Sequence, residues 1–171
     1  HLLMVADLDD ASIGETCVID IEAVPRLLEP VAKGARMTYR STLVAGEGFG
    51  AERIISSVQD LAVSPDDTVV FYYSGHGARG DSKPDAWPVL SLGSAAPPYD
   101  TLDLAWIYQT LHDKNPRMLL MFVDCCQQQL PDAYIADSTP KGTARLPEPL
   151  IQANYRSLFR MHRGEVLMMS C

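Results

Sequence analysis

Two continuous apolar runs, each ending abruptly at polar residues, constrain the fold of this chain most. Val69–Tyr73 leads into His76, and Met118–Val123 leads into Cys126. Unbroken apolar runs of this length predict strands that are buried on both faces, as in a parallel sheet covered by helices. Ligands bind outside the carboxyl ends of such strands. We therefore expect His76 and Cys126 to meet in one crevice.

The remaining sequence predicts one α/β domain, which the length of 171 residues suits. The expected strands are 1–6, 36–45, 68–74, 117–123 and 165–170, with a short strand at 89–92, and the expected helices are 16–28, 51–61, 102–111 and 151–161. Pro25 should kink the first helix, which should end at Pro30 and Gly34. The short strand at 89–92 lies within a Gly- and Pro-rich segment, 78–98, and the Pro-rich segment 127–149 should be a mobile loop. This order predicts a three-layer sandwich with a mainly parallel sheet flanked by helices.

Bulk composition argues against several classes of partner. The formal net charge of −8 disfavours nucleic acid and anionic membranes. No apolar run approaches the ~20 residues of a membrane span. The four cysteines lack the regular spacing of a zinc site or a disulfide framework. We therefore expect a reducing, cytoplasmic setting and no metal in the chemistry.

Cys126 and His76 are the candidate nucleophile and the candidate general acid/base. Only a thiolate attacks a carbonyl, and a nearby imidazole, with an unperturbed pKa of about 6.5, can generate it or pair with it. Cys125 should be structural, because adjacent residues at a strand end point to opposite sides. The alternative is that both cysteines are small buried apolar residues and His76 a surface residue. Gly75 and Gly77 favour the functional interpretation, because they let the backbone approach a ligand closely.

Three motifs carry a resemblance to a known family. Tyr72–Gly77 contains YSGHG, Asp124–Cys126 matches the first half of DCCHSG, and Cys17–Asp20 is similar to GCxND. Cys126 follows His76 by 50 residues (126 − 76), a caspase-type offset. The chain therefore resembles the caspase-like cysteine proteases, and among them the metacaspases and their bacterial relatives. It departs from metacaspases at 127–129, where three glutamines replace His-Ser-Gly.

The resemblance implies a Cys-His dyad endopeptidase that cleaves after Arg or Lys. The amides of Gly77 and Cys126 would form the oxyanion hole. Asp20 and Asp124 would hold the basic side chain of a peptide or protein substrate, since carboxylates bind guanidinium in a bidentate fashion. Asp124 follows a buried strand, where an unpaired carboxylate would be costly. The alternative for Asp20 is a solvated helix residue.

The resemblance spans nearly the whole chain and implies a peptidase domain over residues 1–171. This would be the large-subunit region, with a small-subunit region outside the chain as its partner. Lys141 and Arg145 are candidate self-cleavage positions, because a Pro- and Gly-punctuated loop suits proteolysis. An uncut loop is the alternative.

The chemistry should need no cofactor, although the resemblance also implies activation by Ca²⁺. Asp100, Asp103 and Asp132 are the candidate residues, but their spacing is not that of a calcium loop, and solvated surface acids are the alternative. Gly46–Ala51 fits G-x-G-x-x-A but follows the second expected strand and lacks the acidic residue of a dinucleotide site, which favours a plain loop.

A second function remains open. The glutamines at 127–129 alter the segment beside Cys126. A caspase-like pseudo-protease that acts as an interaction or regulatory module is therefore the alternative to an active endopeptidase.

Overall fold

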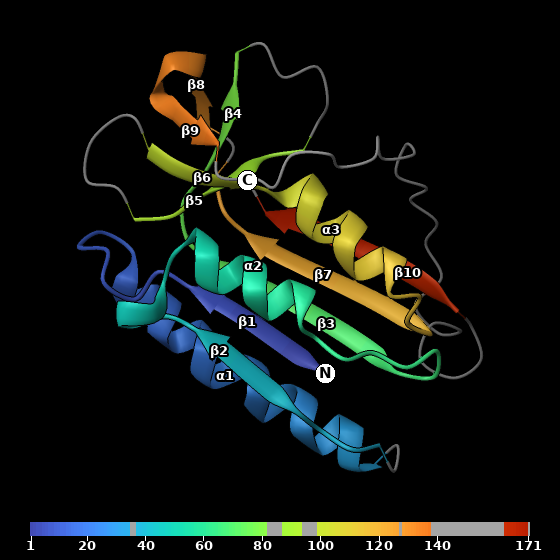
Figure 1. Ribbon diagram of the computed structural model, residues 1–171. Helices are drawn as coiled ribbons and strands as arrows, with labels where there is room; N and C mark the ends of the chain where they lie inside the picture. The colour runs from blue at the N-terminus through green and yellow to red at the C-terminus, as the bar shows by residue number, and fades with distance from the viewer. Residues whose placement is uncertain (35–36, 82–86, 94–98, 127, 138–162, 171) are drawn as a thin grey trace.

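The structure, a computed structural model, describes residues 1–34, 37–81, 87–93, 99–126, 128–137 and 163–170. These residues form two five-stranded sheets and three α-helices (Figure 1).

Sheet A is the large parallel sheet. Its strands are β1 (Leu2–Ala6), β2 (Ser41–Val44), β3 (Thr68–Ser74), β7 (Met118–Asp124) and β10 (Gly164–Ser170), in the spatial order β10-β7-β3-β1-β2. Every pairing between these strands is parallel. The two apolar runs of the sequence become β3 and β7, which pair along their full length. The predicted parallel sheet is thus confirmed.

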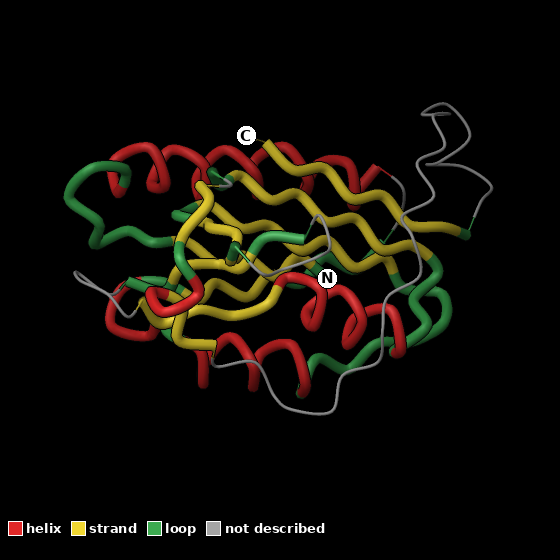
Figure 2. Tube along the Cα trace, turned by 90° about the horizontal axis from the view of Figure 1, so that it is seen from above, coloured by secondary structure: helices red, strands yellow, loops and turns green. Residues whose placement is uncertain are grey.

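Helices cover both faces of sheet A. They are α1 (Gly14–Gly34) on one face and α2 (Ala51–Gln59) and α3 (Leu104–Asp113) on the other (Figures 1 and 2). The chain steps from β1 to β2 in one direction and then returns past β1 to β3. Because such crossovers are right-handed, the two connecting helices lie on opposite faces. This arrangement confirms the predicted three-layer α/β sandwich.

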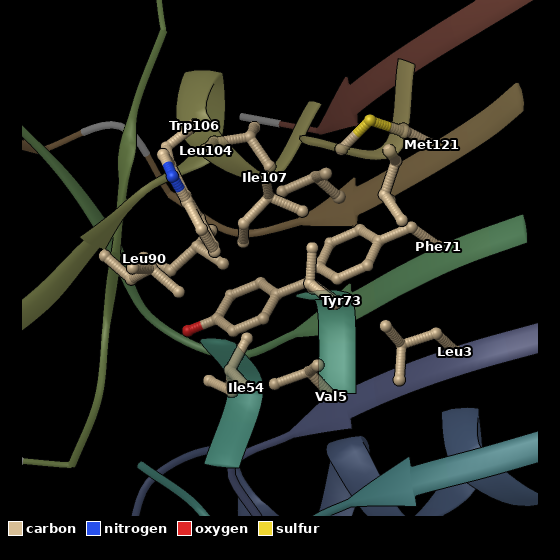
Figure 3. Close-up of a cluster of buried hydrophobic side chains, with 14 of the residues drawn as sticks. Leu3, Val5, Ile54, Phe71, Tyr73, Leu90, Leu104, Trp106, Ile107 and Met121 are labelled. Carbon is tan, nitrogen blue, oxygen red and sulfur yellow. The ribbon is translucent and has the colours of Figure 1, made fainter. Parts of the chain in front are cut away.

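Successive residues of each strand point to opposite faces of sheet A, one of which is covered by α1 and the other by α2 and α3. The side facing α2 and α3 buries a cluster that includes Val5, Ile54, Phe71, Tyr73, Ile107 and Met121 (Figure 3). The side facing α1 buries a smaller cluster of Leu2, Met4, Val70, Met118 and Leu120, against which Ile21, Val24 and Leu28 pack. Since full burial of such a side chain contributes about 1.5–3 kcal/mol, these two interfaces fix the strand register.

The first helix is longer than the sequence predicts. It begins at Gly14 and continues through Pro25 and Pro30 to Gly34, so the expectation that Pro30 ends it is wrong. A proline inside a helix removes a hydrogen bond and costs about 3 kcal/mol. Packing of the inner face of α1 against sheet A offsets this cost.

Sheet B is smaller, mixed and not predicted as a sheet. It contains β4 (Gly77–Gly80), β5 (Val89–Ser91), β6 (Tyr99–Asp103), β8 (Gln128–Leu130) and β9 (Ile135–Asp137), in the order β8-β4-β5-β6-β9. The expectation of a loop from 127 is therefore wrong for residues 128–137, which form β8, a 3-10 turn (Asp132–Tyr134) and β9. β8 and β9 are short strands, and the strands with which they pair, β4 and β6, are distant in the sequence. The helix expected at 151–161 lies outside the described residues.

Other boundaries shift by a few residues. The strand expected at 36–45 is reduced to β2, and a second 3-10 turn occupies Gly46–Gly48. The helix expected from 102 begins at Leu104, because the Asp103 side chain caps it by accepting a hydrogen bond from the Ala105 amide at 2.8 Å.

Candidate active site

Strand register brings the segments of His76 and Cys126 side by side. In sheet A, Ser74 of β3 pairs with Asp124 of β7, and in sheet B, Ala78 of β4 pairs with Gln128 of β8. Both pairs are separated by 50 residues (124 − 74 and 128 − 78). His76 and Cys126 therefore occupy matching positions between the two sheets, at the carboxyl edge of sheet A.

Gly77 lies directly against the two cysteines. A Cβ at this position would lie 2.6 Å from Cys125 Sγ and 2.6 Å from the Cys126 carbonyl oxygen. No side chain fits there without a shift of the backbone. The close approach that the sequence suggested for this glycine is thus toward the chain itself, and it keeps the Gly77 and Cys126 backbones adjacent.

The two adjacent cysteines differ in environment. Cys125 is 4% exposed and belongs to the core between sheet A and helices α2 and α3. Cys126 is exposed to solvent. This difference follows the expected alternation at a strand end. Of the two thiols, only that of Cys126 is accessible to a substrate.

The backbone of His76 is fixed from two directions. Its carbonyl oxygen accepts hydrogen bonds from the Ser91 amide at 2.9 Å and from the Tyr73 hydroxyl at 2.7 Å. Burial raises the pKa of Tyr73 well above its usual range, so the hydroxyl remains a donor. The His76 ring therefore projects from an anchored position.

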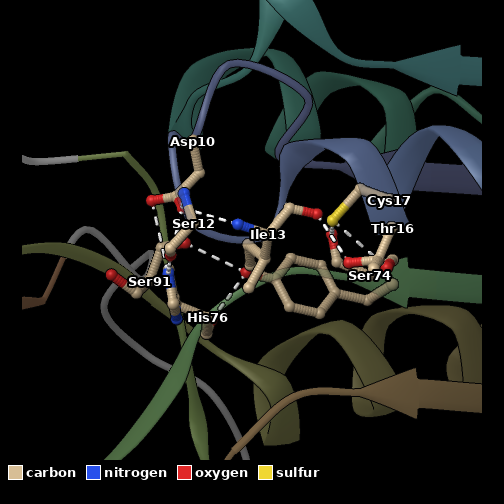
Figure 4. Close-up of polar contacts among 9 residues, drawn as sticks. Asp10, Ser12, Ile13, Thr16, Cys17, Ser74, His76 and Ser91 are labelled. Atoms are coloured by element: carbon tan, nitrogen blue, oxygen red, sulfur yellow. Dashed lines mark hydrogen bonds and ion pairs between the residues drawn. The ribbon is translucent and has the colours of Figure 1, made fainter.

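The His76 ring contacts the loop that follows β1. Nε2 lies 3.3 Å from Asp10 Oδ2 and 3.5 Å from Ser12 Oγ (Figure 4). The His76 side chain is 45% exposed, and that of Asp10 is 27% exposed. Asp10 was not among the residues predicted from the sequence. The available signal was its place just after the first predicted strand, at the edge where the carboxyl ends of parallel strands gather.

Asp10 is held in place by its own loop. Oδ1 accepts hydrogen bonds from the Ser12 amide at 2.7 Å, the Ser12 hydroxyl at 2.5 Å and the Ile13 amide at 3.1 Å. These bonds, that of the Ser12 hydroxyl foremost, lower the pKa of Asp10 to about 2. The carboxylate that faces His76 is therefore ionised at neutral pH.

Asp20 and Asp124 approach the end of β3 on the α1 face. The Ser74 hydroxyl donates a hydrogen bond to Asp20 Oδ2 at 2.7 Å and lies 3.4 Å from Cys17 Sγ. Ser74 pairs in register with Asp124, whose Oδ1 accepts a hydrogen bond from the Ser170 hydroxyl. The structure thus brings these residues to one end of sheet A.

The side chains of the two aspartates are less enclosed than a buried strand end suggests. Asp124 is exposed, because β7 leaves the core at its last residue, so its carboxylate carries no burial cost. Asp20 is half-buried rather than fully solvated. Burial and the neighbouring Asp20 carboxylate raise the pKa of Tyr72, which faces the same helix.

The candidate calcium ligands do not converge. Asp103 caps α3, and Asp132 packs against Gly80 of sheet B. Within the described parts of the chain, no group of three or more His, Cys, Asp or Glu side chains could hold a metal ion. The described residues therefore do not fit a calcium site. Lys141, Arg145 and Gln127 lie outside the described residues.

Comparison with known proteins identifies the family of this chain. None of the described helices is long and apolar enough to cross a membrane. A search of curated proteins gave no match. The family model for the caspase domain matches residues 15–171, which include His76, Cys126 and all of sheet A except β1. The chain therefore belongs to the caspase domain family of cysteine peptidases.

Proposed function

We propose that this domain is an endopeptidase that cleaves peptide bonds after Arg or Lys, with Cys126 as nucleophile and His76 as general acid/base. The observation that supports the proposal is the common 50-residue register of β3 with β7 and of β4 with β8, which brings the chain segments of the exposed Cys126 and the anchored His76 next to each other.

The chemistry follows from these two groups. The Cys126 thiolate attacks the substrate carbonyl, and the negative charge moves to the carbonyl oxygen. As the tetrahedral intermediate collapses, the C–N bond breaks and the imidazolium of His76 gives its proton to the leaving amine. Water, deprotonated by His76, then releases the acyl group and restores the thiol. The adjacent amides of Gly77 and Cys126 would donate hydrogen bonds to the oxyanion.

Specificity for basic residues rests on the acidic end of β3. Asp20 and Asp124 lie around Ser74, and the Asp124 carboxylate is exposed. Two carboxylates on one side of the nucleophile favour an Arg or Lys side chain and repel an Asp side chain. A small-subunit region, which the resemblance implies, would supply the rest of the substrate-binding surface.

Turnover of peptides that differ only in the residue before the scissile bond tests the proposal. Arg and Lys peptides should be hydrolysed, and the Asp peptide should be inert. Cys126→Ala and His76→Ala should each abolish turnover, whereas Cys125→Ala should retain much of it. Preferred cleavage after Asp would refute the specificity. If the wild-type protein binds but never cleaves these peptides, the chain is instead a regulatory pseudo-protease.

A further inference from the structure

We propose that Asp10 is a positioning residue for His76. It holds the ring with Nε2–H directed at the Asp10 carboxylate and Nδ1 left to serve Cys126. The role in turnover rests on the proposed function, but the ring geometry can be tested without it.

The topology of sheet A puts Asp10 where such a residue is needed. β3 has β7 on one side and β1 on the other. β1 pairs with β3 through Ala6 and Ser74, and the Asp7 amide donates to the Ser74 carbonyl at 3.1 Å. The segment after β7 therefore delivers Cys126 to one side of the His76 segment. The loop after β1 delivers Asp10 to the other side.

The two oxygens of the Asp10 carboxylate have separate partners. Oδ1 accepts all three hydrogen bonds from Ser12 and Ile13, which fix the side chain (Figure 4). Oδ2 faces His76 Nε2 at 3.3 Å. Within the described residues, Nδ1 of His76 has no hydrogen-bond partner in the protein. The ring is thus engaged on one nitrogen and open on the other.

This arrangement selects one state of the imidazole. A carboxylate can only accept at Nε2, so the neutral ring carries its proton there and presents Nδ1 as the base. When Nδ1 takes up a proton, the same carboxylate stabilises the imidazolium. Asp7 and Asp10 both interact electrostatically with His76, and burial raises the pKa of Asp7. Of these, Asp10 alone is in ion-pair contact with the ring.

Asp10→Asn separates positioning from folding. The amide keeps an oxygen for Ser12 and Ile13 and replaces Oδ2 with an NH₂ donor. A donor facing Nε2 favours the opposite tautomer, with the proton on Nδ1. We expect kcat to fall about 10- to 100-fold with KM within about twofold, less than the ~10⁴-fold loss for the buried aspartate of serine proteases. Asp9→Asn, the same charge change in the same loop, should leave kcat within about twofold.

The tautomer itself is the deciding readout. Ring ¹⁵N chemical shifts of His76, recorded at alkaline pH where the imidazole is neutral, should report Nε2–H in the wild-type protein and in Asp9→Asn. They should report Nδ1–H in Asp10→Asn. A wild-type ring protonated on Nδ1 would overturn the proposal, and that measurement needs no variant to fold. A wild-type protein that cleaves no peptide would refute the proposed function, while the ring shifts would still decide the role of Asp10.

Discussion

β3 and the segment 128–137, which we call the β8–β9 arm, both border the site, but they are stabilised differently. Val69, Val70, Phe71 and Tyr73 of β3 are all buried, and the strand is paired on both sides. The arm is exposed or half-buried at every described side chain, and β8 and β9 are the edge strands of sheet B. The 50-residue register of β3 with β7 recurs between β4 and β8. We infer from this comparison that sheet A provides most of the stability, and that the pairing of β3 with β7 sets the offset with which β4 and β8 then pair.

The largest expected effect is on stability and comes from a substitution in β3. Phe71→Ala removes a fully buried ring between sheet A and helices α2 and α3. It should lower the free energy of unfolding by about 3–5 kcal/mol. Gln129→Ala, at an exposed position in the arm, should change it by less than about 0.5 kcal/mol. Urea denaturation of both variants measures the difference, and equal losses would show that the arm also carries stability.

The second prediction concerns the acidic end of β3. Asp124→Asn should reduce kcat/KM for Arg peptides by an amount equivalent to up to about 1.5–3 kcal/mol, because the negative charge that pairs with the guanidinium is lost. Asp113→Asn, at the end of α3, is the matched control and should leave kcat/KM unchanged. If the two variants behave alike with Arg peptides, the basic side chain binds elsewhere.

The third prediction concerns Gly77, which lies against Cys125 and Cys126 at the junction between sheets A and B. In Gly77→Ala the new methyl group meets Cys125 Sγ and the Cys126 carbonyl, so the backbone must move. We expect a loss of about 1–3 kcal/mol in stability from overpacking. The accompanying displacement of Cys126 should reduce kcat at least about tenfold. Gly48→Ala, where a Cβ meets no atom closer than 4.0 Å, should change neither quantity. Full activity in Gly77→Ala would show that the site tolerates a shifted junction.

The next prediction concerns self-cleavage in the part of the chain between β9 and β10. We propose that the domain cuts itself after Lys141 or Arg145. Mass spectrometry after incubation should then find a fragment ending at one of these residues in the wild-type protein and an intact chain in Cys126→Ala. If the enzyme is fully active while its chain is uncut, self-cleavage is not required for activity.

A related proposal is activation by calcium, for which the described residues supply no site. The test compares the rate of Arg-peptide hydrolysis with added Ca²⁺ and with a chelator. A higher rate with Ca²⁺ would support activation, and equal rates would remove the metal from the account.

The centre of sheet A could be predicted from the sequence because β1, β3 and β7 are mainly apolar runs, whose burial on both faces leaves a local signal. Thr68–Ser74 is the clearest case, with bounds that match the prediction. Sheet B could not, because strands such as Gly77–Gly80 depend on partners far away in the chain rather than on their own composition. For the site, strand-end placement and motif resemblance predicted His76 and Cys126. Asp10 has no such motif, since its proximity to His76 arises only when β1 pairs with β3.

Covalent labelling tests directly whether Cys126 is a nucleophile that His76 serves. An Arg-directed electrophilic peptide should modify the wild-type protein at a single cysteine, which peptide mass spectrometry should identify as Cys126. His76→Ala should label much more slowly, and an Asp-directed probe should not react. Modification at Cys125 or Cys17, or labelling of equal rate in His76→Ala, would show that Cys126 and His76 do not act together as a dyad.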